Sequence, residues 1–254
     1  MHKTQVKKHM ERLRHSELQS VRKWFRSGMK VLEIGGGNGF QAAQIASWNC
    51  EVESFELPGH SPEYFPVKEY DGHLFPCPDL TFDIVFSSNV LEHIKPIVPT
   101  LQEIRRLLKP EGIAIHILPS PAWRFWSIVS YYPYLLARLI SKSLKWIRIR
   151  NSDAARASSA KQTSDSSIPS RIVKLMIPRP HGEFPSAISE LHYYRRVRWQ
   201  REFRDAGFDI LEIYDNGIFY TDHVLLPFMD LGIRKLLAKL FGSSCNIFIL
   251  TVKK

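Results

Sequence analysis

Cysteine is scarce in this chain. The 254 residues include only Cys50, Cys77 and Cys245. An odd number of widely separated cysteines fits neither a disulfide framework nor the clustered spacing of a zinc site. We therefore expect a reducing compartment, which favours a cytoplasmic protein, and we expect no metal site.

Long apolar runs are also absent. The polar, basic segment 1–10 is followed by no apolar stretch of the kind found in signal peptides, so we expect neither secretion nor import into an organelle. Hydrophobic residues make up 44% of the chain and charged residues 24%, which is usual for globular proteins. This composition excludes a mainly disordered, collagenous or multi-span membrane protein.

Acidic residues are the minority among the charges. There are 25 Asp and Glu against 35 Lys and Arg, so the formal net charge is +10. Residues 1–30 carry 9 basic and 2 acidic side chains and 119–205 carry 16 and 6, whereas 31–118 carry 5 and 12. The two basic segments would suit nucleic acid, anionic lipid or an acidic substrate, and the net charge alone does not choose among them.

Short apolar runs alternate with helical patterns between residues 29 and 118. The expected strands are 29–34, 51–57, 67–71, 82–87 and 113–118, and the expected helices are 40–48 and 98–108. The second helix is expected to stop at the Lys-Pro-Glu-Gly sequence of 109–112. Five strands with helices between them predict an open parallel sheet of the α/β class.

A glycine-rich turn joins the first strand to the first helix. Residues 31–39 read Val-Leu-Glu-Ile-Gly-Gly-Gly-Asn-Gly. This is not the dinucleotide spacing G-x-G-x-x-G, whose last glycine would fall on Phe40, and no Gly-Lys-Ser/Thr follows as in a P-loop. The missing phosphate-binding lysine and the presence of Glu33 favour a ligand with a cationic end. Alternatively, Glu33 holds the glycine turn.

Further carboxylates lie at the expected ends of the next strands. Glu56 ends the second strand 17 residues after Gly39, where an open α/β sheet places a carboxylate that binds both ribose hydroxyls. Asp71-Gly72 ends the third strand, although Asp71 is also a turn former, and Asp83 at the start of the fourth is expected to be structural. A nucleoside with a zwitterionic tail, S-adenosyl-L-methionine, suits this arrangement.

With these residues, the segment 29–118 resembles the class I S-adenosylmethionine-dependent methyltransferases, of the broad subgroup that includes the ubiquinone and menaquinone biosynthesis enzymes. The resemblance rests on 33–39, Glu56, 71–85, the Val-Leu-Glu-His of 90–93 and 107–112. It implies a Rossmann-like, doubly wound, mostly parallel seven-stranded sheet with a terminal antiparallel strand. It further implies that Glu33, Gly35, Gly37 and Gly39 lie at the cofactor, that Glu56 binds the ribose, that Asp71 and Gly72 lie at the adenine, and that Asn89 lies at the methionine end.

We expect a single methyltransferase domain over 1–254. Its expected parts are a basic N-terminal helix in 1–28, a cofactor-binding half in 29–118, a long insertion or lid in 119–185 after strand five, and C-terminal strands and helices in 186–254. Within the insertion, 123–150 predicts an amphipathic basic helix and the serine-rich 151–170 predicts disorder. The last part predicts helices at 199–206 and 231–241 and strands at 208–214 and 245–252.

Methyl transfer to a hydroxyl needs a base, and histidines near strand ends are the candidates. His93 follows the fourth strand, His181 follows the serine-rich stretch, and His192 precedes two tyrosines. The fourth strand is not followed by the Asn/Asp-Pro-Pro-aromatic signature of amino-methylating nucleic-acid enzymes. This argues against adenine methylation and leaves oxygen, carbon and other nitrogen acceptors open.

The helix expected in the insertion gives a clue to the class of acceptor. Its apolar side would hold Leu136, Leu139, Ile140, Leu144 and Ile147, and its basic side Arg138, Lys142 and Lys145. Such a helix suits an anionic membrane surface, and a lid helix packed on the domain is the alternative. We therefore expect a small-molecule or lipid-linked acceptor, such as a quinone precursor, a lipid or a saccharide, methylated on oxygen or carbon by a cytoplasmic or peripherally membrane-bound protein. The alternatives are an RNA methyltransferase that uses the basic segments and a catalytically silent interaction protein.

Overall fold

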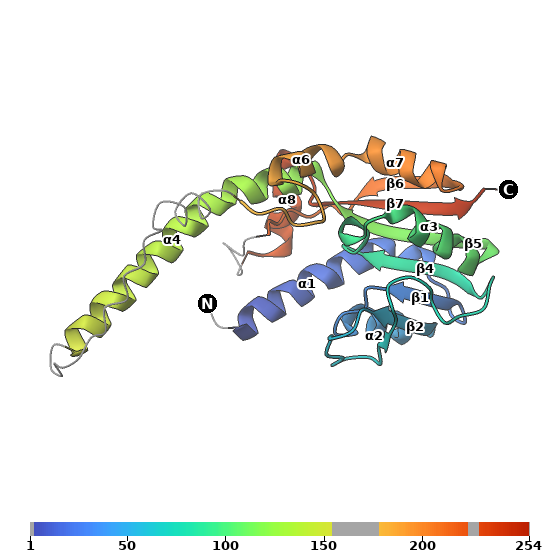
Figure 1. Ribbon diagram of the computed structural model, residues 1–254, viewed down its shortest axis with the longest axis horizontal. Helices are drawn as coiled ribbons and strands as arrows, with labels where there is room; N and C mark the ends of the chain where they lie inside the picture. Colours follow the sequence, from blue (N-terminus) through green and yellow to red (C-terminus); the bar gives the residue numbers. More distant parts are fainter. Residues whose placement is uncertain (1–2, 154–177, 223–228, 254) are drawn as a thin grey trace.

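A seven-stranded sheet forms the centre of the protein (Figure 1). The computed structural model describes residues 3–153, 178–222 and 229–253, without the side chains of 3–4 and 142–153. The strand order is β3-β2-β1-β4-β5-β7-β6. The strands are β1 (Lys30–Ile34), β2 (Glu51–Glu56), β3 (Lys68–Glu69), β4 (Phe82–Ser88), β5 (Leu108–Pro119), β6 (Phe208–Asp215) and β7 (Cys245–Val252).

The strand directions confirm the expected doubly wound sheet. Strands β1 to β5 are parallel where they pair, and β7 lies between β5 and β6, antiparallel to both. The central strands β4 and β5 are buried along most of their length, which explains their near-continuous apolar sequences. The carboxyl ends of β1, β2 and β4 therefore share one edge, where ligands bind in open α/β sheets.

Helices cover both faces of the sheet. They are α1 (Lys3–Val21), α2 (Phe40–Ser47), α3 (Ile97–Leu107), α4 (Pro121–Asp153), α6 (Ala187–Tyr193), α7 (Arg196–Asp205) and α8 (Leu231–Phe241), with the short 3-10 turns η1 (Arg22–Trp24) and η2 (Leu91–His93). Apolar side chains of α3 and α7 belong to one hydrophobic cluster, and those of α1 and α2 belong to the other. Figure 1 shows α7 and α1 on opposite sides of the sheet, and α4 extending away from it.

The expected N-terminal helix is present as α1, and its apolar side belongs to the core. Leu13, Leu18 and Val21 are at most 2% exposed, and Phe25 just after the helix is buried with them. Full burial of one such side chain contributes about 1.5–3 kcal/mol to stability. The basic residues of α1 and η1 are partly paired: Lys7 of α1 forms an ion pair with Glu63, and Lys23 of η1 forms one with Glu212.

Two sequence predictions about boundaries are wrong. The fifth strand begins at Leu108, not at Ile113, so 109–112 belongs to β5 and is not a turn. Leu108 pairs with Phe82 across a register shift, and the ion pair of Lys109 with Asp83 (2.7 Å) fixes this early part of the strand. Asp83 is therefore structural, as expected.

The second boundary lies in the insertion. Helix α4 contains the expected amphipathic segment and continues to Asp153, so disorder was wrongly predicted for 151–153. Extending an existing helix costs little, because each added residue brings one more backbone hydrogen bond. Residues 154–170 lie outside the described part of the chain. The short helix α6 was not predicted from the sequence.

Candidate active site

The glycine turn between β1 and α2 has three glycines with positive φ. The φ values are +78° at Gly35, +54° at Gly37 and +79° at Gly39. A Cβ atom on Gly35 would overlap the side chain of Val90, and one on Gly39 would lie 2.5 Å from a backbone oxygen of Phe65. A Cβ on Gly37 would meet no atom within 4 Å. Two glycines therefore allow close packing, and Gly37 leaves its backbone open to a ligand.

Glu33 lies beneath this turn. Its side chain is buried, and its Oε2 accepts a hydrogen bond of 2.6 Å from the Oγ of Ser54. A Cβ on Gly36 would lie 3.1 Å from the same oxygen. Burial raises the pKa of Glu33 to about 7, against the lowering effect of Ser54. This placement fits the turn-holding alternative, and a contact of Glu33 with the cofactor stays a prediction.

Glu56 reaches the open side of the turn. Its Oε2 accepts a hydrogen bond of 3.1 Å from the backbone NH of Gly37, and its Oε1 accepts one of 2.9 Å from Leu57. The carboxylate therefore lies at the carboxyl end of β2, next to the space that a Cβ on Gly37 would fill. This geometry fits a carboxylate that receives ribose hydroxyls, a role that stays a prediction.

Asp71 and Gly72 form a turn after β3. The Oδ1 of Asp71 accepts hydrogen bonds from the backbone NH groups of His73 (2.8 Å) and Leu74 (3.2 Å), which lower the pKa of Asp71. Gly72 has a φ of +85°. A cavity of about 580 Å³ opens between this turn and the start of α3. Asp71 thus acts as a turn former, and contact of the pair with adenine stays a prediction.

Asn89 ends β4 in a left-handed conformation with a φ of 56°. Its backbone NH donates to the carbonyl of Ile117 (2.8 Å), and its Nδ2 donates to the Oγ of Ser88 (3.1 Å). The Sγ of Cys245 lies 3.6 Å from its Oδ1. The side chain is therefore fixed at the carboxyl end of β4, where the resemblance predicts the methionine end of the cofactor.

Two of the three candidate histidines lie together at this edge. The ring centroids of His93 and His181 are 4.9 Å apart, and the ring of Trp123 lies 4.8 Å from that of His181. Burial lowers the pKa of His93, and it lowers the pKa of His181 to about 4. Both imidazoles are therefore neutral near pH 7, the form in which a ring nitrogen can act as an acceptor. His192 is exposed on α6, where its ring meets that of Tyr193.

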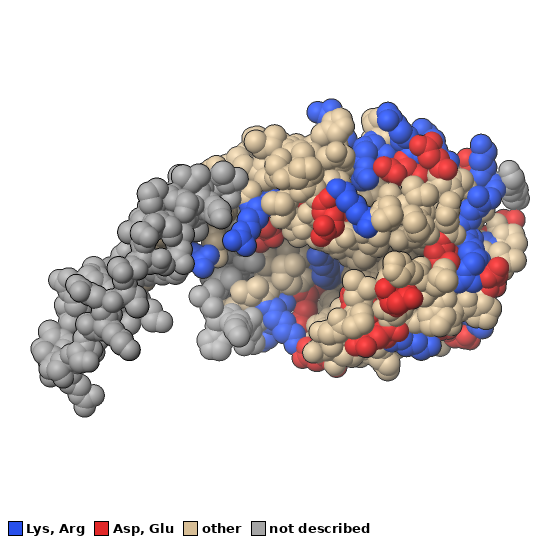
Figure 2. Space-filling view, in the orientation of Figure 1, with Lys and Arg blue, Asp and Glu red and all other residues tan. Residues whose placement is uncertain are grey.

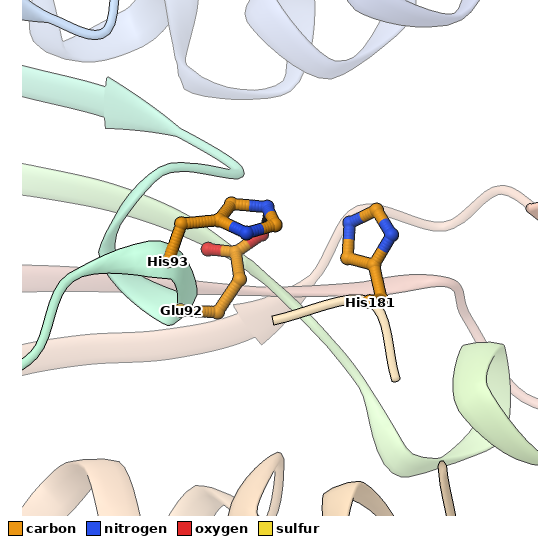
Figure 3. A group of neighbouring side chains, drawn as sticks. All are labelled: Glu92, His93 and His181. Carbon is orange, nitrogen blue, oxygen red and sulfur yellow. Dashed lines mark ion pairs between the residues drawn. The ribbon is translucent and has the colours of Figure 1, made fainter. Parts of the chain in front are cut away.

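A buried carboxylate that the sequence reasoning missed accompanies the two histidines. Glu92 precedes His93 in η2, and Figure 3 shows both side chains and His181 directed toward one another. Glu92 is 1% exposed, and burial raises its pKa to about 8. One signal in the sequence points to Glu92, since it belongs to the Val-Leu-Glu-His stretch of the resemblance, but nothing in that stretch indicates burial.

The segment carrying His181 is held by Glu190 of α6. One Glu190 oxygen accepts 2.7 Å hydrogen bonds from the backbone NH groups of His181 and Gly182. Its other oxygen forms a 2.6 Å ion pair with Arg124 of α4, which is almost fully buried. A Cβ on Gly182 would lie 2.6 Å from the carbonyl oxygen of Glu92, so glycine allows this segment to approach η2 closely.

Helix α1 closes the site from another side. Glu17 is fully buried and forms a 2.6 Å ion pair with Arg14. Glu17 also accepts hydrogen bonds from Asn216 (3.2 Å) and from the hydroxyl of Tyr220. Cys245 lies 3.4 Å from Glu17 and also approaches Asn89. A continuous set of polar contacts thus connects α1 with the end of β4.

The comparisons with known proteins agree with this geometry. A curated relative, an uncharacterized methyltransferase of Mycobacterium sp. (strain JLS), is 30% identical over 95 residues, which are 35% of this chain and 38% of the relative's length. A methyltransferase of Mesorhizobium loti, solved as S-adenosylmethionine dependent, has a TM-score of 0.52 at 13% identity and covers 93% of this chain and 97% of its own. One from Aquifex aeolicus has a TM-score of 0.50 at 12% identity, covering 93% and 89%.

These structures share the fold of S-adenosylmethionine-dependent methyltransferases with this chain. The family model described as methyltransferase domain matches residues 6–213, which include the glycine turn, η2 and the segment of His181. The expected family is therefore confirmed, whereas nothing in the matches separates the ubiquinone-type subgroup from others. The chain belongs to the methyltransferase domain family.

Proposed function

We propose that this protein transfers a methyl group from S-adenosyl-L-methionine to an oxygen or carbon atom of a small-molecule or lipid-linked acceptor, such as a quinone precursor, a lipid or a saccharide. The observation that carries this proposal is the pair of neutral histidines at the end of β4, beside the glycine turn. Val90, two residues before Glu92, lies directly against Gly35. The histidines and the glycine turn therefore belong to one site.

The residues at the glycine turn suit this cofactor. Bound S-adenosyl-L-methionine would supply an activated methyl group on a cationic sulfonium. Gly37 offers open backbone, Glu56 offers carboxylate oxygens beside it, and Glu33 adds negative charge below. The acidic excess of residues 31–118 further favours a positively charged ligand over a phosphate-rich one.

The acceptor side suits a hydroxyl. A neutral imidazole accepts a proton at neutral pH, and proton removal by a positioned base accelerates such reactions by about 10²–10⁴-fold. His93 and His181 are partly exposed, whereas Glu92 beside them is buried. Alignment of the acceptor with the methyl group would be the other task of this pocket.

An apolar surface beside the site supports a lipid-linked acceptor. On α4, five side chains spaced by three or four residues are 42–59% exposed: Phe125, Val129, Tyr132, Leu136 and Ile140. On α8, Ile233, Leu236, Leu240 and Phe241 are similarly exposed. Trp126 joins the two helices, because its ring lies 4.9 Å from that of Phe241 and its Nε1 donates to the Phe241 carbonyl.

We propose that this α4–α8 surface rests on an anionic membrane. Amphipathic helices bind such surfaces through apolar burial together with basic residues, and residues 119–205 carry a large basic excess. Figure 2 shows uncharged surface over the base of α4 and α6. Among the described helices, none combines the length and hydropathy needed to cross a membrane. The side chains of Lys142, Leu144, Lys145 and Ile147 lie outside the described part.

The lid alternative accounts for part of α4 only. Trp123 and Leu135 are at most 6% exposed and pack on the protein, whereas Phe125, Val129, Tyr132, Leu136 and Ile140 are 42–59% exposed. For an RNA acceptor, no specific observation adds to the charge pattern. RNA therefore remains an outcome of the experiment below.

The experiment is a labelling assay with fractionated acceptors. The protein is incubated with methyl-labelled S-adenosyl-L-methionine and separate lysate fractions of lipids, small molecules, proteins and RNA. We expect label in the lipid or small-molecule fraction, whereas label confined to RNA or protein would refute the proposal. Glu56→Ala should abolish cofactor binding and labelling, and Glu51→Ala, at the exposed start of β2, is its matched control.

A further inference from the structure

Glu92 is the side chain that cofactor binding leaves unexplained. It is fully buried, yet neither of its carboxylate oxygens has a hydrogen-bond partner among the described residues. Burying a carboxylate without a partner is strongly unfavourable, so native proteins pair such a group with a cation or hold it for a ligand. The position of Glu92 at the edge of the proposed acceptor pocket favours a ligand.

Two imidazoles approach this carboxylate. Donor atoms of Glu92, His93 and His181 lie within 4.8 Å of one another, and the Nε2 of His93 is 3.8 Å from the Oε1 of Glu92 (Figure 3). Two donors bound to one ion at about 2.1 Å each are at most about 4.2 Å apart, so shifts of less than about 1 Å would close the cluster. Small side-chain rotations are enough for that.

We propose that Glu92, His93 and His181 bind a divalent transition-metal ion at the carboxyl end of β4. Two imidazole nitrogens and one carboxylate suit Zn²⁺, Mn²⁺ or Fe²⁺ better than Mg²⁺, which prefers oxygen ligands. Three protein ligands leave coordination positions open, as in catalytic metal sites. No metal site is expected from the sequence, in which His181 is far from the other two residues.

Further groups lie around the cluster. Histidine ligands usually direct their second ring nitrogen toward a carboxylate or carbonyl. The Nδ1 of His181 lies 4.0 Å from the Oδ1 of Asp222. Glu190 fixes the backbone of His181 and Gly182 by two hydrogen bonds of 2.7 Å, so the ligand-bearing segment is held in place.

The charge around the cluster also suits a divalent ion. Two ion pairs lie next to it, Arg14 with Glu17 and Arg124 with Glu190, and each is neutral within itself. This leaves Glu92 and Asp222 as the carboxyl groups that face the two histidines without a Lys or Arg ion-pair partner among the described residues. A divalent cation would stabilise the charged form of both.

The metal site narrows the chemical class of the acceptor, and this step rests on the proposed function. With an ion bound, the two imidazoles would act as ligands in place of the base role given above. An open coordination position would then bind a hydroxyl oxygen of the acceptor and make its deprotonation easier. The acceptor class would then be a hydroxyl-bearing molecule methylated on oxygen.

Metal titration of the full chain tests the site without any methyl transfer. The chelator-treated protein is titrated by calorimetry with MnCl₂, ZnCl₂, CoCl₂ and MgCl₂ in the absence of S-adenosyl-L-methionine. We expect one ion per chain, with weaker binding of Mg²⁺ than of Mn²⁺. Affinity should fall about 100-fold or more in Glu92→Gln and His181→Asn, since both remove a ligand. His192→Asn, an exposed histidine on α6, should bind as the unchanged protein does.

Several outcomes would overturn the site. These are no saturable binding of any of the four ions, equal binding by Glu92→Gln, or Co²⁺ absorption bands of thiolate ligation, which would place the metal on Cys77. Thermal melting checks that each variant folds, and His93→Asn replaces any variant that does not. Metal binding by an inactive protein would contradict the proposed function alone, and methyl transfer without metal binding would contradict this inference alone.

Discussion

The ligand-binding edge of the sheet has a proposed cofactor side and a proposed acceptor side, and the carboxylates of the two sides differ in their hydrogen bonds. On the cofactor side, Glu33, Glu56 and Asp71 each accept hydrogen bonds from Ser54 or from backbone NH groups. On the acceptor side, Glu92 is buried without a hydrogen-bond partner among the described residues, next to two histidines whose pKa values burial lowers. In the first half the carboxylates find hydrogen-bond donors within the protein, whereas in the second half Glu92 does not, which is the basis of the metal site proposed above.

The difference follows from how each half is assembled. The cofactor side is made of turns that follow β1, β2 and β3 directly, so neighbours in the sequence or on adjacent strands supply the partners. The acceptor side brings together α1, η2, the segment around His181 and the region of Tyr220, which are far apart in the chain. It can therefore vary with the acceptor while the cofactor side stays unchanged.

The largest expected effect concerns the acceptor side. His181→Ala should lower the rate constant of methyl transfer by about 10²–10⁴-fold, because the pocket loses a positioned imidazole. The affinity for S-adenosyl-L-methionine should stay within about twofold, since His181 lies outside the glycine turn. His192→Ala is the matched control and should keep the full rate. Equal rates of methyl transfer in the two variants would show that His181 takes no part in the reaction.

Substitution of Gly35 should mainly lower the stability of the protein, whereas substitution of Gly37 should mainly weaken cofactor binding. Gly35→Ala should lower the free energy of unfolding by about 2–4 kcal/mol, because a left-handed alanine is strained and its Cβ would overlap Val90. Gly37→Ala should cost only the strain of about 1–2 kcal/mol, yet weaken cofactor binding about tenfold by filling the open space. Urea unfolding and calorimetry measure the two effects. Similar cofactor affinity of Gly37→Ala and the unchanged protein would show that the cofactor binds elsewhere.

Glu33 should make cofactor binding depend on pH. The pKa of Glu33 is raised to about 7 in the folded protein, so its carboxyl is largely protonated at pH 6 and largely charged at pH 7.5. A cationic cofactor favours the charged form, so affinity should rise about fivefold over this interval. Glu33→Gln should bind more weakly with a flat pH profile. A flat profile in the unchanged protein would leave Glu33 as a turn-holding residue only.

The smallest expected effect concerns the α4–α8 surface. Leu136→Ser should reduce binding to vesicles of anionic lipid about two- to fourfold, because one exposed leucine no longer enters the interface. Cosedimentation measures the effect, with vesicles of neutral lipid as comparison. Glu63→Gln serves as the surface control, because Glu63 lies in the loop that contacts Lys7 of α1 and not on the α4–α8 surface. If Leu136→Ser cosediments like the unchanged protein, the α4–α8 surface does not contact lipid.

The sequence predicted the fold well where local patterns decide it. The run from Lys30 to Ser47 determines a strand, a turn and a helix, and the buried apolar runs of β4 and β7 predict strands directly. The start of β5 escaped prediction because the pairing of Leu108 with Phe82 overrides the Pro-Gly signal of 109–112. Helix α6 escaped because seven residues show too little periodicity.

The candidate site was predictable only in part. His93 and His181 could be proposed singly, but their meeting depends on Gly182 and Glu190, whose roles appear only in three dimensions. Burial of Glu92 depends on the covering segments from α1 and from the insertion. No local pattern encodes such a juxtaposition, and a charged residue beside a histidine predicts exposure as readily as burial.

The ion pair between Arg124 and Glu190 affects what insertions cost in stability. The chain leaves the sheet near Arg124 and has returned by Glu190, so this pair joins both ends of the excursion at its base. Lengthening a loop whose ends are already joined costs little conformational entropy, about 0.6 kcal/mol for each doubling. We therefore expect insertions between α4 and the segment of His181 to cost little stability, so the proposed acceptor surface can change while His181 and Glu190 keep their places.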